Sequence, residues 1–111
     1  MTNRKKALQE LLAKVEDGSW DCKFPQSGLS GLRSAKRYRN AAKAYNGSLD
    51  AAKALHDAVL PDYEWTFYYD GECSVQERKG RGIYFTSIDK NPARAWLIAI
   101  LRAHIAMDDE G

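Results

Sequence analysis

The chain of 111 residues is poor in cysteine and proline, and it has no long apolar run. Its two cysteines, Cys22 and Cys73, lack the CxxC spacing of zinc and redox sites, so both are expected to be ordinary thiols. No apolar stretch approaches the roughly 20 residues that span a membrane. The first 15 residues alternate charge with leucine and do not resemble a signal peptide. These absences argue against a disulfide scaffold and a membrane protein, and they predict a cytoplasmic location.

Motifs of catalysis are also absent. The sequence has no GxSxG elbow, no HExxH helix and no GxxxxGK[ST] phosphate loop. His56 and His104 each lie on or beside the apolar stripe of a predicted helix, where a histidine usually belongs to the core or its edge. The sequence therefore predicts a protein that is not an enzyme and that holds no cofactor and no metal.

Acidic residues are missing from one segment of the chain. Residues 23–49 contain six cations and no acid, residues 50–111 contain eleven acids and seven cations, and the formal net charge is +2. The stretch GLRSAKRYRNAAKAYNG, residues 31–47, predicts an amphipathic helix over residues 32–45, with Tyr38 and Tyr45 inside and the cations outside. Two interpretations stay open: a solvated face that keeps a small domain soluble, or a surface that binds an anion.

Three further helices follow from the spacing of apolar residues. Leucine and valine recur at helical spacing between Leu8 and Val15, and Gly18 ends that helix before a long irregular connection over residues 18–31. Ser48 is a suitable N-cap for a helix that ends before Pro61. The last helix, residues 92–107, is apolar on nearly all sides, so it is either central in the fold or shared with a second copy.

A small antiparallel sheet is predicted between the last two helices. The stretch YEWTFYYDGECSVQE alternates on both sides of Asp70-Gly71, and a three-residue loop would pair Phe67 with Cys73 and Trp65 with Val75. GIYFTS is the third strand, after the basic connection RKGRG at residues 78–82. Trp65, Phe67 and Tyr69 should face the core, and Tyr68 and Tyr84 the opposite face. We expect one α+β domain over residues 1–111, with a sheet of about three strands sandwiched between α-helices, so that both faces are covered.

Two blocks, YNGSLDAAKALHDAVLPDYEW and NPARAWLIAILRAHIA, together with ALQELLAKVEDG at residues 7–18, resemble the phage ABA sandwich domain family. The resemblance covers about 60% of the chain, in order. It implies a sheet sandwiched between helices and a phage or prophage origin, and therefore the cytoplasm of a host cell. It implies no activity and no site residues, and the cationic helix at residues 32–45 has no counterpart in the family pattern.

The sequence thus predicts an accessory protein of a phage or prophage that acts by binding. The first candidate ligand is a phosphate-bearing nucleotide, such as a signal of host defence that the protein would sequester. A nucleic-acid-binding module working through the basic helix and an inhibitor that binds a host protein are the alternatives. A homodimer through residues 92–107 is expected to complete the pocket. The candidate ligand-binding residues are Arg33, Lys36, Arg37, Arg39, Lys43, Tyr68, Arg78, Arg81 and Tyr84.

Overall fold

The computed structural model describes residues 2–22, 35–68, 70–78 and 84–110. It contains four helices and one three-stranded antiparallel sheet with strand order β1-β2-β3. The predicted α+β class with a small sheet is therefore confirmed. In chain order, the elements are α1 (Thr2–Asp17), α2 (Ala35–Tyr45), α3 (Leu49–Val59), β1 (Tyr63–Phe67), β2 (Glu72–Glu77), β3 (Tyr84–Ile88) and α4 (Pro92–Glu110).

Helix ends follow the capping residues of the sequence. The Ser48 hydroxyl accepts a hydrogen bond from the Ala51 amide at 3.1 Å, as an N-cap does. The Asn91 side chain accepts from the amide of Ala93 at 3.0 Å at the start of α4. Helix α2 ends before Gly47, whose φ of +109° is a conformation that glycine adopts without strain. Most of the predicted connection 18–31 and the first three residues of the predicted helix 32–45 lie outside the described residues.

The predicted hairpin register is confirmed. Phe67 pairs with Cys73 and Trp65 pairs with Val75 across β1 and β2. The Tyr68 amide donates to the Glu72 carbonyl at 2.9 Å, and this bond closes a loop of three residues. Gly71 is the last residue of the loop and has a φ of +91°. A two-residue loop would have turned the apolar row of β1 toward the polar row of β2.

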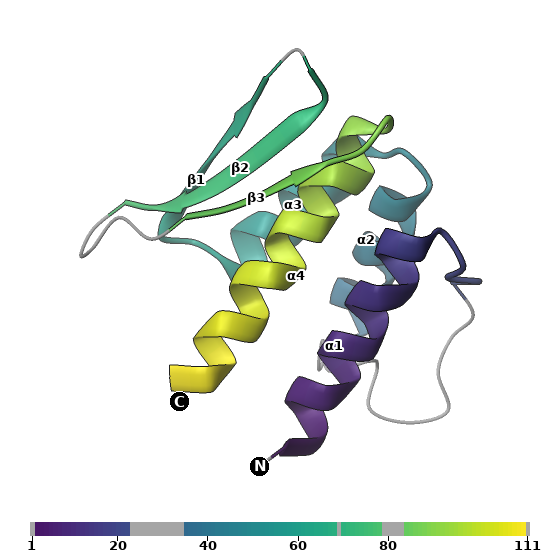
Figure 1. Cartoon of the computed structure of the whole chain (residues 1–111), viewed down its shortest axis with the longest axis vertical. Coiled ribbons are helices and arrows are strands. Elements are labelled where there is room, and N and C mark those ends of the chain that lie inside the picture. The colour runs from purple at the N-terminus through teal and green to yellow at the C-terminus, as the bar shows by residue number, and fades with distance from the viewer. Residues whose placement is uncertain (1, 23–34, 69, 79–83, 111) are drawn as a thin grey trace.

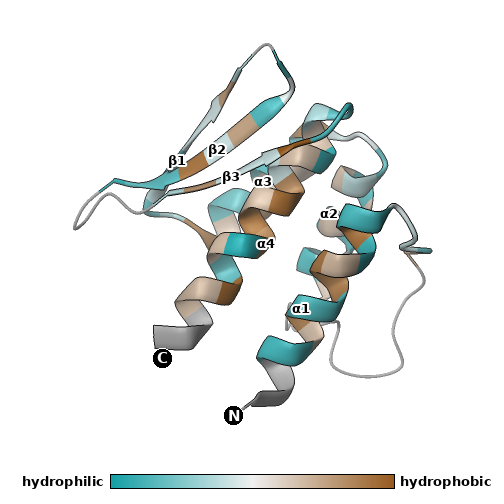
Figure 2. Ribbon diagram, viewed as in Figure 1, coloured by the Kyte–Doolittle hydropathy of each residue, from teal (hydrophilic) through white to brown (hydrophobic). Residues whose placement is uncertain are grey.

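Helix α4 is the centre of the fold, as one of the two predicted alternatives stated. It contacts β2 and β3 on one side and α1, α2 and α3 on the other (Figure 1). Its segment from Ala95 to Leu101 is buried without interruption, and hydrophobic bands recur along it in Figure 2. The apolar surface that was expected to form a homodimer is thus buried within a single copy of the chain.

The sheet has one covered face and one open face. Figure 1 shows the helices on one side of the sheet, with α4 directly beneath it. Tyr68 and Tyr84 point to the other side and are 51% and 63% exposed. The expectation that helices cover both faces therefore needs correction for the described part of the chain, where the layers run from sheet to α4 to the remaining helices.

The inner face of β1 is also more open than predicted. Trp65 is half-buried and Phe67 is 39% exposed, although both were expected in the core, and Tyr69 lies outside the described residues. Because β1 is an edge strand and α4 contacts mainly β2 and β3, the far end of β1 extends beyond the helix that covers the sheet.

Candidate functional site

The open face of the sheet is built from three rows of side chains. The register places one residue of each strand in every row, so the rows follow directly from the strand pairing. Successive rows are about 6.6 Å apart, because a strand rises roughly 3.3 Å per residue and alternate residues share a face. The rows are Glu64–Gln76–Tyr84, Thr66–Ser74–Thr86 and Tyr68–Glu72–Ile88.

A hollow of about 370 Å³ lies on this face. The tyrosine rings belong to its two ends, in the first and third rows, and the polar side chains lie between them. Its lining residues are Tyr68, Glu72, Ser74, Gln76, Tyr84 and Thr86. Hydroxyl, amide and carboxylate groups can donate to or accept from a polar ligand, and tyrosine rings offer faces on which a planar group can stack. The hollow therefore suits a ligand that is planar and carries polar edges.

Arg78 belongs to the same face. Its amide donates to the Asp62 carbonyl at 2.9 Å, which continues the pairing of β1 with β2 by one step. Its guanidinium is 3.9 Å from the Glu64 carboxylate, and both side chains are more than half exposed. Such an exposed pair is weak, so Arg78 can exchange Glu64 for another anion at little cost. The Cα atoms of Arg78 and Tyr84 are about 8 Å apart, which is the diagonal of one row spacing and one strand spacing.

Three of the cations of α2 form an exposed stripe, and a fourth, Arg37, bonds to a neighbouring helix. Lys36, Arg39 and Lys43 are exposed and lie on one side of α2, within about 60° of each other at 100° per residue. Arg37 is only partly exposed, and its guanidinium donates to the Ala58 carbonyl of α3 at 3.2 Å. Arg33 lies outside the described residues. Three of the five predicted cations thus form an outward stripe, and Arg37 also links two helices.

The predicted ligand-binding residues do not form one pocket in a single copy. Helix α2 packs on α3 and α4 and lies on the far side of α4 from the sheet (Figure 1). The stripe of α2 and the tyrosines of the open face are therefore on separate surfaces. Tyr68, Arg78 and Tyr84 share the open face, whereas Arg81 lies outside the described residues. Sequence reasoning missed Glu72, Ser74, Gln76 and Thr86, although the alternation of β2 and the predicted register place them on the face of Tyr84.

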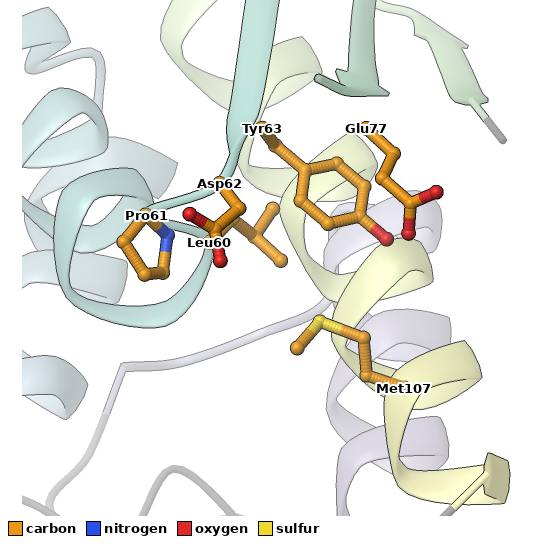
Figure 3. A pocket seen from close by; sticks show the side chains of 6 residues that line it. All are labelled: Leu60, Pro61, Asp62, Tyr63, Glu77 and Met107. Carbon is orange, nitrogen blue, oxygen red and sulfur yellow. The ribbon is translucent and has the colours of Figure 1, made fainter. Parts of the chain in front are cut away.

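A second pocket of about 310 Å³ lies at the C-terminal ends of α3 and β2 (Figure 3). Tyr63 and Glu77 lie side by side across it from Leu60 and Asp62, with Met107 of α4 below. No cation is among the described lining residues of this pocket, and its two carboxylates, Asp62 and Glu77, repel an anion. This pocket is therefore a poor place for a phosphate-bearing ligand, and the open face remains the candidate site.

The two cysteines lie in surroundings that make their thiols unreactive; Cys73 is buried and Cys22 is partly buried. Cys73 and Cys22 are both free thiols. Burial raises the pKa of the Cys73 thiol to about 12, with the charge of Glu72 adding to the effect. Burial also raises the pKa of Cys22. Both shifts disfavour the nucleophilic thiolate. In the part of the chain that the structure describes, no group of three or more His, Cys, Asp or Glu residues is arranged to hold a metal ion.

His56 is a structural histidine with both ring nitrogens engaged. The Trp96 indole N–H donates to its Nδ1 at 3.2 Å, so the proton is on Nε2, which donates to the Tyr63 carbonyl at 2.9 Å. The side chain is 1% exposed. The neutral ring satisfies both partners. In a protonated ring, the N–H at Nδ1 would face the indole N–H of Trp96, and two donors cannot bond to each other.

This network predicts that stability falls on mild acidification. Burial lowers the pKa of His56 below its ordinary value of 6.5, so the unfolded chain binds a proton more readily than the folded one. The free energy of unfolding should therefore be highest above pH 6.5 and decrease as the pH falls below it. Thermal unfolding at pH 7.5 and 5.5 measures the effect. His56→Gln should lower stability at both values and reduce the difference between them; an unchanged difference would contradict this assignment.

No family model, no curated protein and no solved structure matches the chain. The resemblance to the phage ABA sandwich domain family consequently stays a prediction from the sequence. No helix in the described ranges combines the length and apolar content of a membrane span.

Proposed function

We propose that the protein is a non-enzymatic binding protein that takes a phosphate-bearing nucleotide on the open face of its sheet. The observation that carries the proposal is the pair of exposed tyrosines at the ends of a polar hollow. Stacking of a base on an aromatic ring contributes about 1–3 kcal/mol per base. In this proposal a base stacks on Tyr84, and Arg78 binds the phosphate.

The spacing and charge around Tyr84 support this arrangement. About 8 Å separates the Cα atoms of Tyr84 and Arg78, a span that a base, sugar and phosphate can bridge. The sequence between these two residues contains Lys79 and Arg81 and no acid. The guanidinium of arginine binds phosphate through two parallel hydrogen bonds. The ligand would thus have its phosphate at Arg78, beyond the end of β2, and its base on Tyr84.

The proposal includes a biological setting. If the resemblance to phage proteins holds, the chain acts in the cytoplasm of a host cell and sequesters a nucleotide signal of host defence. The same face would then work by occupancy alone, because sequestration needs affinity and no chemical step.

Calorimetric titration with nucleoside monophosphates tests the proposal. Tyr84→Ala should weaken binding about tenfold through lost stacking, and Tyr84→Phe should preserve it. Glu64→Gln should strengthen binding about two- to fivefold, because it releases Arg78 and removes a negative charge beside the phosphate. Glu10→Gln on α1 makes the same charge change on a different element and should have no effect. Equal responses to Glu64→Gln and Glu10→Gln, or no binding to any nucleotide, would refute the proposal.

The exposed stripe of α2 favours a second candidate, a nucleic-acid-binding module. Lys36, Arg39 and Lys43 extend over about 10 Å of the helix, at 1.5 Å per residue, and α2 contains no acid. Such a stripe can contact the phosphate backbone of a duplex, with an affinity that falls steeply with salt. A mobility shift of duplex DNA or RNA that disappears when all three residues are changed to glutamine would support this candidate. No shift at low salt would dismiss it.

A further inference from the structure

The two tyrosines of the open face are too far apart for one base. Tyr84 begins β3 in the first row, and Tyr68 directly follows β1 in the third row, with β2 between them. Two row spacings and two strand spacings place their Cα atoms roughly 16 Å apart on a diagonal. A single base can therefore stack on one ring only, and in the proposed function a mononucleotide with its phosphate at Arg78 stacks on Tyr84. Full use of the hollow requires a ligand with more than one base.

We propose that the ligand is a single-stranded oligonucleotide of at least three nucleotides, which lies diagonally across the sheet with one nucleotide per row. This inference rests on the proposed function and names the class of its ligand. One base stacks on Tyr84 and another on Tyr68. The middle nucleotide lies over Ser74 and Thr86, whose hydroxyls can hydrogen-bond to its polar edge.

The geometry favours a single strand over a duplex. Bases in a duplex are stacked on each other and expose only their edges, whereas a strand without a partner can turn its bases onto aromatic rings. Between the two tyrosines the middle row of the face carries only the short polar side chains of Thr66, Ser74 and Thr86, so a nucleotide chain has room to cross.

Glu72 gives the Tyr68 end a preference for particular bases. It lies directly across from Tyr68, and its side chain lines the hollow. A carboxylate accepts hydrogen bonds and donates none, so it favours a base that presents an amino group, such as cytosine with its N4 group. Uracil presents carbonyl oxygens beside its single N–H, and these repel the carboxylate. We therefore expect cytosine to be preferred over uracil at the nucleotide on Tyr68.

A length series tests the inference. Cytidine mono-, di-, tri- and tetranucleotides are titrated into the full chain at low salt, and affinity should rise up to the trinucleotide. Tyr68→Ala should weaken trinucleotide binding about tenfold and leave mononucleotide binding unchanged, whereas Tyr84→Ala should weaken both. Tyr68→Phe keeps the ring and should preserve trinucleotide affinity. The preference for the cytidine over the uridine trinucleotide should decrease in Glu72→Gln.

The outcomes separate this inference from the proposed function. A trinucleotide that binds no more tightly than the mononucleotide, or that is insensitive to Tyr68→Ala, overturns the single-strand inference. If mononucleotide binding still depends on Tyr84 in that case, the proposed function stands. Absence of binding across the whole series overturns the proposed function, and the inference with it. Tyr68 and Tyr84 are exposed, so the alanine variants are expected to fold, and circular dichroism checks this directly.

Discussion

Replacement of Trp96 by alanine is expected to lower the free energy of unfolding by about 3–5 kcal/mol. The side chain is 3% exposed and lies between α4 and the inner face of the sheet. Its ring stacks on Trp65 with centroids 4.9 Å apart and meets Phe67 edge-on at 5.3 Å. The substitution removes these contacts, leaves a cavity beneath β1 and deprives His56 of its donor. Urea denaturation followed by circular dichroism measures the loss.

Trp96→Phe is the matched control for the aromatic contacts. Phenylalanine retains a ring at this position and loses the indole N–H, so it should destabilise the protein less than alanine does. The remaining loss combines the smaller volume of the ring with the lost hydrogen bond to His56, which contributes about 1–3 kcal/mol for a buried acceptor left without a partner. A loss below about 1 kcal/mol for Trp96→Ala would be outside the range for a well-packed core and would contradict the position of α4 as the central layer.

Replacement of Arg102 by methionine is expected to lower the free energy of unfolding by about 2 kcal/mol. The guanidinium donates to the Thr86 carbonyl of β3 and binds the Glu16 carboxylate of α1 at 2.6 Å. Arg102 thus links the sheet, the central helix and the first helix through one side chain. Methionine keeps the apolar stem and removes both interactions, and chemical denaturation measures the difference.

Glu16→Gln separates the two interactions of Arg102. The ion pair is more than one-third exposed on both sides, so its loss alone should change stability by less than about 1 kcal/mol. The larger part of the Arg102 effect should therefore come from the Thr86 carbonyl. Equal losses for Arg102→Met and Glu16→Gln would show that the bond to the strand contributes nothing.

The sequence was most informative where one physical constraint acts alone. The alternation of β1 and β2 around Asp70-Gly71 admits one register that keeps both apolar rows on the same face, and that register is observed. Ser48 and Asn91 cap their helices because their side chains are the nearest acceptors for the first amides. The apolar character of residues 92–107 predicted a helix that is either central or shared with a second copy, and α4 is central.

The sequence pattern could not predict how the layers of the fold are arranged. Tyr68 and Tyr84 alternate to the outer face in any register, but whether a helix covers that face depends on where the chain turns between elements. Arg37 illustrates the same limit: its bond to the Ala58 carbonyl depends on how α2 packs on α3, and a helical wheel drawn for α2 alone cannot contain that information. The predicted site therefore combined three residues that share the open face with cations of α2 that lie on another surface.

The separation of the two faces has a consequence for function. The contacts that stabilise the sheet are on its inner face, with α4, and the outer rows contribute mainly cross-strand pairs of about 0.2–1 kcal/mol each. Side chains of the outer face can consequently be chosen for binding at little cost in stability. Tyrosines that are more than half exposed are consistent with such a role, since burial does not explain their presence.

Amide chemical-shift mapping tests the central claim most directly, namely that the open face of the sheet is the binding surface. The ¹⁵N-labelled protein is titrated with cytidine monophosphate and then with the cytidine trinucleotide. We predict that the amides of Gln76, Arg78 and Tyr84 shift with both ligands, that those of Tyr68 and Glu72 shift only with the trinucleotide, and that α2 is unaffected. Shifts confined to α2, or no shifts with either ligand at millimolar concentration, would contradict the account.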